Sequence, residues 1–215
     1  MNLGFKILAF SAIFSSFIQI IVGKKIISCY HTNWSQYREG LGRFYPENID
    51  PFLCDIIIYA FAKLEGDRLD PFEFNDLSTD TKVGMYEQTL DLKKKNPNLK
   101  ILIATGGWNV GSGPFSVMAN NFEMRKNFVK NAREFVQLHG FDGLDLDWEY
   151  PGSREGSAVT DKEVFSLLIS ELKAEFEPYD LMLTAAVGVS EKIVEAGYEV
   201  EKICRDLDFV NLMSY

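Results

Sequence analysis

Short apolar runs recur along the chain and alternate with longer segments whose apolar residues have helical spacing. The run at 55–61 is almost continuously apolar, which is typical of a strand buried on both faces of a parallel sheet. Helical spacing is clearest at 121–138, and Gly140 follows as a stop signal. The pattern predicts a loop or small excursion at 64–80. The predicted strands are 25–30, 55–61, 100–105, 141–151, 181–187 and 209–215, and the predicted helices are 81–95, 121–138, 160–176 and 198–206.

Strands that alternate with helices predict an α/β fold with a parallel sheet. Two architectures compete, the doubly wound sheet and the eight-stranded TIM (β/α)8 barrel. No predicted strand is followed by a nucleotide-type Gly-x-Gly-x-x-Gly turn, and the special residues lie at the carboxyl ends of several strands, where barrels build their sites. Because a full barrel needs about 250 residues, we expect 24–215 to be one domain, an incomplete barrel that holds strands one to six.

In the segment 141–151, carboxylates alternate with large apolar residues. Successive side chains of a strand point to opposite faces, so the carboxylates share one face and the apolar residues share the other. An ordinary half-exposed strand would also alternate. However, stacked acids repel one another, and a face of this kind more often lines a cleft that binds a metal or transfers protons. The three carboxylates are Asp145, Asp147 and Glu149.

The first residues have the layout of a secretory signal peptide. Lys6 supplies a positive charge, residues 7–22 are almost wholly apolar or small, and Gly23 offers a small residue for cleavage. A retained membrane anchor is the alternative, but the apolar run is short for a membrane span. We therefore expect a signal peptide at 1–23, a secreted protein, and no membrane association after cleavage.

Charge restricts the class of partner. The net charge of −9 and a pI near 4.8 disfavour nucleic acid and anionic membranes, because phosphate binding needs clustered Lys and Arg. The aromatic content of 13% would suit a stacking ligand such as a carbohydrate, although this signal is weak. We expect a monomer.

The chain has three cysteines, and secretion would permit a disulfide. Cys29 and Cys54 lie in successive predicted strands, where a bridge is geometrically easy. In the chain-entropy model such a bridge would stabilise the fold by roughly 3.5 kcal/mol. Cys204 lies in a predicted helix, and we expect it to be a buried free thiol.

The stretch Asp142-Gly143-Leu144-Asp145-Leu146-Asp147-Trp148-Glu149 resembles the Asp-x-x-Asp-x-Asp-x-Glu signature of glycoside hydrolase family 18, the chitinases. Four further stretches resemble, in the right order, the ends of that family's strands one, two, three and six; they are 30–38, 59–62, 104–108 and 211–215. Within these stretches, Ala104 stands where many members of the family have Ser, and His31 stands where another aromatic residue is usual.

The resemblance implies a role for each matched residue. Glu149 would be the general acid, and Asp147 would hold the substrate's N-acetyl group while its carbonyl oxygen attacks the anomeric carbon. Asp145 would share a proton with Asp147, and Tyr215 would hydrogen-bond the acetyl carbonyl. Asp142 is out of phase with these acids, and we expect it to fix the entrance of the strand. The residues expected to line the sugar-binding site are Tyr30, Phe61, Gly107, Trp108 and Met213.

The resemblance therefore predicts a secreted, endo-acting chitinase that cleaves β-1,4-linked N-acetylglucosamine with retention and needs no cofactor or metal. Its partners would be chitin or chito-oligosaccharides. One alternative is a chitinase-like lectin, which would bind chitin without cutting it. Another is that residues 1–215 alone form an inactive truncated fragment with exposed sheet edges. A calcium site is disfavoured, because residues 145–151 lack the Gly-containing turn of calcium loops.

Overall fold

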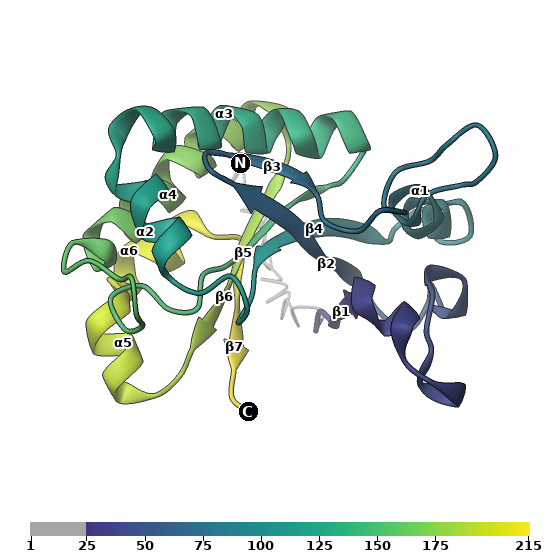
Figure 1. Cartoon of the computed structure of the whole chain (residues 1–215), viewed down its shortest axis with the longest axis horizontal. Helices are drawn as coiled ribbons and strands as arrows, with labels where there is room; N and C mark the ends of the chain where they lie inside the picture. Colours follow the sequence, from purple (N-terminus) through teal and green to yellow (C-terminus); the bar gives the residue numbers. More distant parts are fainter. Residues whose placement is uncertain (1–24) are drawn as a thin grey trace, which may run out of the picture.

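The computed structural model describes residues 25–215, so the predicted signal peptide at 1–23 lies outside the described residues. A curved sheet forms the centre of the molecule (Figure 1), with strands in the order β1-β2-β4-β5-β6-β7 and β3 paired to β2 off this path. All neighbours on the main path are parallel. The strands are β1 (Ser28–Thr32), β2 (Ile56–Glu65), β3 (Arg68–Pro71), β4 (Lys100–Gly106), β5 (Gly143–Asp147), β6 (Met182–Gly188) and β7 (Phe209–Met213).

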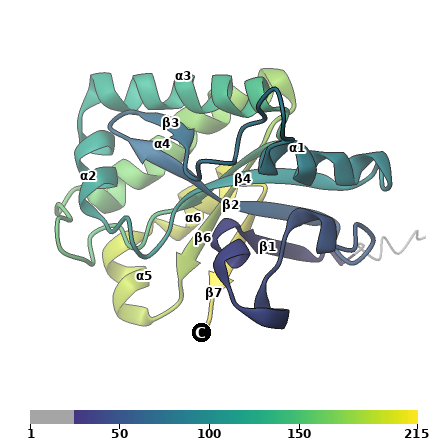
Figure 2. The same ribbon diagram turned by 45° about the vertical axis from the view of Figure 1, so that its right-hand side comes forward.

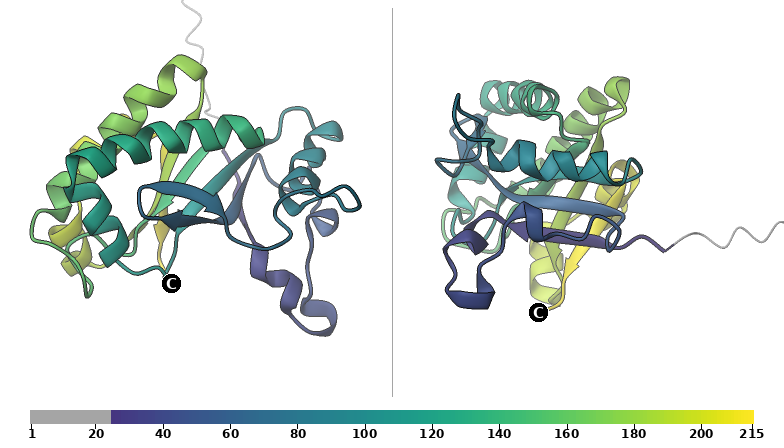
Figure 3. Two further views of the ribbon diagram at one scale, coloured as in Figure 1. Left: turned by 45° about the horizontal axis from the view of Figure 1, so that its top comes forward. Right: turned by 90° about the vertical axis from the view of Figure 1, so that its right-hand side faces the viewer.

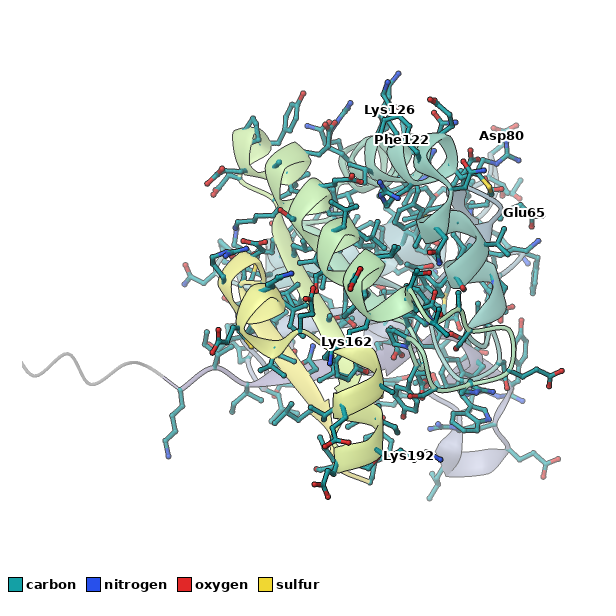
Figure 4. The ribbon with its side chains drawn as sticks, turned by 90° about the vertical axis from the view of Figure 1, so that its left-hand side faces the viewer. Glu65, Asp80, Phe122, Lys126, Lys162 and Lys192 are labelled. Carbon is teal, nitrogen blue, oxygen red and sulfur yellow. A yellow bond between two sulfur atoms is a disulfide. The ribbon has the colours of Figure 1, made fainter. Side chains whose placement is uncertain are left out.

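Helices cover one face of this sheet (Figures 1 and 4), where α3 packs on α4 and α4 contacts β6. Lys162, near the start of α4, donates a hydrogen bond to Glu195 O at 2.7 Å and so joins α4 to α5. The helices are α1 (Met85–Leu90), α2 (Gly113–Asn120), α3 (Phe122–His139), α4 (Asp161–Phe176), α5 (Glu191–Gly197) and α6 (Val200–Asp206). The short 3-10 helices are Asn33–Tyr37, Gly40–Gly42, Pro46–Asn48, Asp91–Lys94 and Glu177–Tyr179.

The two faces of the sheet carry two separate apolar clusters. The larger cluster lies between the sheet and the helices and includes Leu144, Leu146 and Trp148. The smaller cluster lies on the opposite face and contains Ile58 and Leu102. Figures 2 and 3 show the sheet fanning round from β1 to β7 like part of a barrel wall. The predicted fold is confirmed as a partial (β/α)8 barrel, with the smaller cluster on its inner face.

The excursion predicted at 64–80 contains a hairpin. β2 continues to Glu65, and after a turn at Gly66 and Asp67 the chain returns antiparallel as β3. Gly66 has φ +64°, a left-handed conformation that glycine adopts at little cost. Leu64 is buried and its neighbours Lys63 and Glu65 are exposed, so the period-2 pattern continues beyond the predicted strand end at 61.

One predicted helix needs correction, and two helices were not predicted. The helix predicted at 81–95 begins only at Met85, because the backbone at Gly84 is extended and lies closely against Leu77 and Ser78. Its last turn is the 3-10 segment Asp91–Lys94. The sequence pattern also missed α2 and α5, each of which has only 7 or 8 residues, too few for a clear helical period.

The predicted disulfide between Cys29 and Cys54 is present, with the two Cα atoms 6.1 Å apart. It joins β1 to the segment before β2. The prediction for Cys204 was half wrong: the thiol is free, but it is exposed on α6 instead of buried. Its position on a short helix at the surface explains the difference.

No helix within residues 25–215 is both long and apolar enough to span a bilayer.

Candidate active site

The acids of β5 lie together at the carboxyl end of the sheet. Asp145 is fully buried, Asp147 is 6% exposed and Glu149 is 8% exposed. The strand itself ends at Asp147, so the strand predicted at 141–151 is shorter than expected. The alternation nevertheless continues past its end, because Trp148 packs in the core beneath the helices, stacked on Phe115. Glu149 therefore stays on the same side as the two aspartates.

Hydrogen bonds from three elements hold Asp145. Its Oδ1 accepts from Thr184 Oγ1 on β6 at 2.5 Å and from Asn211 Nδ2 on β7 at 3.2 Å. Its Oδ2 accepts from the Tyr30 hydroxyl on β1 at 2.8 Å. The Thr184 contact follows from the sheet register, which pairs Asp145 with Thr184 directly. Burial raises the pKa of Asp145, and these three donors oppose that rise. The predicted proton sharing with Asp147 stays a prediction.

Asp147 is buried with an unsatisfied acceptor. Its Oδ1 has no hydrogen-bond partner among residues 25–215. Burial, followed by repulsion from Glu149 and Asp145, raises the pKa of Asp147 to about 8. The carboxyl is therefore mainly protonated at neutral pH. A buried polar group without a partner costs about 1–3 kcal/mol, so a ligand that brings a hydrogen bond to this oxygen would recover free energy.

Two neighbouring side chains, those of Tyr150 and Arg154, act on the Glu149 carboxyl. Burial raises its pKa, while a hydrogen bond from the Tyr150 side chain and the charge of Arg154 act in the opposite direction. Burial, followed by the charge of Glu149 and the hydrogen bond to it, raises the pKa of Tyr150 to about 12. Glu149 therefore keeps its proton to a higher pH than an exposed glutamate, as a general acid requires.

Tyr30, Met213 and Tyr215 approach the acids from the two edge strands of the described sheet. The Tyr30 hydroxyl binds Asp145, and its pKa is strongly raised by burial and by the charge of that acid. Met213 ends β7 beside Gly188 of β6. Tyr215 is exposed, but desolvation and then the charges of Asp147 and Glu149 raise the pKa of its hydroxyl, which places that hydroxyl near the two acids. Met213 shares the strand parity of Asn211, whose side chain donates to Asp145, so it belongs to the acid side of the sheet with Tyr30.

The other predicted sugar contacts form a group, with Phe61 at an irregularity within β2 and with Gly107 and Trp108 just after β4. The Phe61 ring lies against Gly107, where an added Cβ would be 2.7 Å from the ring. Gly107 has φ +87° and donates its N–H to Asp147 O at 2.8 Å, so a side chain here would disturb the acid strand. Trp34 stacks on Phe61, with ring centroids 5.8 Å apart. Trp108 is 61% exposed and available to a ligand.

Asp142 lies at the entrance of β5, as predicted. Its Oδ2 accepts from Ile101 N at 2.8 Å, and its carboxylate pairs with Lys93 at 2.8 Å and with Lys100 at 3.5 Å. It thus joins the starts of β4 and β5 at the end opposite the acids. His31 is also structural: it packs against the rings of Phe44 and Tyr59.

Sequence reasoning missed four residues that contact the acids. Thr184 and Asn211 reach Asp145 only through the pairing of β5, β6 and β7, and no single-strand pattern could reveal this. Tyr150 follows Glu149 directly in the sequence, and this adjacency was the available signal. Arg154 had no signal, because it lies in an irregular loop.

Within residues 25–215, no group of three or more His, Cys, Asp or Glu side chains could hold a metal ion. The acid face is better suited to proton transfer, because its carboxyls are buried, crowded and shifted to higher pKa.

Comparison with known proteins agrees with this arrangement. The model of glycosyl hydrolases family 18 matches residues 26–215. Mouse chitotriosidase-1 is 46% identical over 194 residues, which cover 87% of this chain and 40% of the mouse protein. The structure of Ostrinia furnacalis Group IV chitinase superposes with a TM-score of 0.82 at 40% identity, covering 89% of this chain and 51% of that one.

A further relative is human YKL-39, described as a pseudo-chitinase with retained chitooligosaccharide binding properties. It has a TM-score of 0.79 and 37% identity, and the match covers 89% of this chain and 51% of YKL-39. The chain thus spans about half the length of the relatives it matches. The family match over nearly all described residues, together with the acid row at the sheet's carboxyl end, shows that the chain belongs to glycosyl hydrolases family 18.

Proposed function

We propose that the whole protein is a secreted chitinase that cleaves β-1,4 linkages between N-acetylglucosamine units of chitin, with Glu149 as the general acid. The observation that supports this most strongly is the complete acid row, in which Asp147 and Glu149 are buried side by side with raised pKa values. The presence of Glu149 argues against a binding-only role.

The first step would combine proton donation with attack by the substrate itself. Glu149 donates its proton to the glycosidic oxygen, and the carbonyl oxygen of the substrate's N-acetyl group forms a bond to the anomeric carbon as the glycosidic bond breaks. The product is a cyclic oxazolinium ion. Water then opens this ion after giving a proton to the Glu149 carboxylate. Because the substrate supplies the nucleophile, this route is an exception to the usual scheme of two enzyme carboxylates.

Asp147 fits the role of acetamido acceptor. Its buried Oδ1 lacks a partner among the described residues, and the N–H of the acetamido group would supply one. Asp145, fixed by Tyr30, Thr184 and Asn211, would hold negative charge behind Asp147. As positive charge develops on the oxazolinium ion, Asp147 would pass its proton to the Asp145 carboxylate, and the Asp147 carboxylate so formed would stabilise the ion electrostatically. Tyr215 would hydrogen-bond the acetyl carbonyl.

Secretion has support apart from the pattern at 1–23. The Cys29–Cys54 disulfide is of the kind that forms and persists in an oxidising compartment.

The second candidate function is chitin binding without hydrolysis, because the relative YKL-39 is described in that way.

A pair of substrates tests the proposal. The whole protein should hydrolyse chitohexaose and leave cellohexaose intact, because only the former carries the N-acetyl group that acts as nucleophile. Product chromatography over a time course would measure both reactions. Cleavage of both sugars at similar rates would exclude substrate assistance, and tight binding of chitohexaose without cleavage would favour the lectin.

A further inference from the structure

Arg154 links the loops that follow β4 and β5. Its guanidinium carbon lies 3.8 Å from the centroid of the Trp108 ring, which places the cation on the indole face. Its Nη1 donates to Trp108 O at 2.9 Å and to Glu149 O at 3.1 Å. One side chain therefore contacts both an exposed aromatic ring and the backbone of the general acid.

The loop that carries Arg154 is firmly anchored. Arg154 N donates to Ser157 Oγ at 3.2 Å, and Ser157 Oγ lies 2.8 Å from Ser112 Oγ, which is fully buried. Ser112 in turn accepts from Trp148 Nε1 at 2.6 Å. At the end of the loop, Asp161 accepts from Ala158 N at 2.8 Å. This anchoring fixes the backbone from which Arg154 reaches Trp108.

A surface arginine would ordinarily pair with a nearby carboxylate. Arg154 has no ion-pair partner within 4 Å among the described residues, and its guanidinium is instead bound to two backbone carbonyls and an aromatic face. Stacking on one face of Trp108 restrains the ring, and the ring also borders a groove lined by Phe61, Trp34 and Gly107. A restrained ring costs less entropy to use as a stacking platform.

We propose that Arg154 is a positioning residue: it holds the Trp108 indole so that the ring can stack on a sugar unit of the chitin chain beside Glu149. The inference rests on the proposed function. A cation–π contact contributes about 0.5–2 kcal/mol, so the loss of this contact should weaken use of the oligosaccharide on the order of tenfold.

A double-mutant cycle tests the coupling. In the whole protein, Arg154→Met and Trp108→Ala should each lower kcat/KM for chitohexaose on the order of tenfold, mainly through KM. In the Trp108→Ala background, Arg154→Met should change kcat/KM by less than about twofold, because the ring it positions is gone. The rates are compared on the acidic plateau of the pH profile, where Glu149 is protonated in every variant. Arg205→Met, an exposed arginine on α6, is the control and should leave kcat/KM unchanged.

Additive effects in the cycle would overturn the positioning role, as would an unchanged KM in Arg154→Met. If Arg154→Met does not fold, Arg154→Gln replaces it in the same cycle. Calorimetric titration of chitohexaose into the same variants, each in the Glu149→Gln background, separates this inference from the proposed function. If the losses of affinity in that background are non-additive, they support the positioning role of Arg154 even if the parent protein proves not to be a hydrolase. If the parent protein hydrolyses chitohexaose but the losses are additive, the positioning role is refuted and the proposed function stands.

Discussion

Replacing Glu149 by Gln in the whole protein should lower kcat for chitohexaose on the order of a thousandfold. The amide has nearly the same shape, but it cannot donate an acidic proton to the leaving oxygen, and general acid catalysis contributes about 10²–10⁴-fold. Binding should persist, because Glu149 contributes little charge to the ground state while it is protonated. Steady-state kinetics and calorimetric titration would measure the two effects.

The matched control is Glu177→Gln, which makes the same chemical change at an exposed glutamate after α4. It should leave kcat and affinity unchanged. If Glu149→Gln kept more than about a tenth of the parent kcat, another group would have to be the proton donor. Loss of binding together with loss of turnover would instead indicate that Glu149 maintains the shape of the site.

Replacing Asp147 by Asn should lower activity and raise stability together. Asn can still pair with the acetamido group, but it cannot become a carboxylate as the oxazolinium ion forms. The loss of one preorganised electrostatic group costs about 10²–10³-fold in kcat. Steady-state kinetics on chitohexaose would measure this loss.

The stability gain follows from the raised pKa of Asp147, about 8 against about 4 in the unfolded chain. Between these values the native state binds more protons than the unfolded state, so the parent protein loses stability as pH rises through this window. Asn does not titrate. The variant should therefore be more stable than the parent by about 4 kcal/mol at pH 7 and nearly equal to it at pH 4.

Denaturant unfolding at both pH values would measure this difference. Asp80→Asn, at an exposed loop position, is the control and should show neither effect. Activity within threefold of the parent would contradict the role of Asp147. An equal stability difference at pH 4 and pH 7 would contradict its raised pKa.

Local sequence patterns predicted those parts of the site that belong to one strand. The alternation in β5 placed Asp145 and Asp147 on one face and Leu144 and Leu146 on the other, because the period of two follows from the backbone alone. The out-of-phase position of Asp142 likewise predicted its separate role. The Cys29–Cys54 bridge was predictable for a related reason, since consecutive strands of a barrel are neighbours.

Contacts between different strands and between loops could not be predicted in this way. The hydrogen bonds from Thr184 and Asn211 to Asp145 depend on the register of three parallel strands. Arg154 depends on a loop whose course is set by Ser157, by the buried Ser112 and by Asp161. The short helices α2 and α5 were missed because seven or eight residues hold only about two helical turns.

In the proposed mechanism the substrate's own N-acetyl group, helped by Asp147 and Glu149, is the nucleophile. The most direct test is the anomeric form of the first product, followed by proton NMR during the first minutes of chitohexaose cleavage, before mutarotation. Two successive displacements at the anomeric carbon predict that the new reducing end appears as the β-anomer and only later equilibrates. An initial excess of the α-anomer would mean a single displacement by water and would contradict the account.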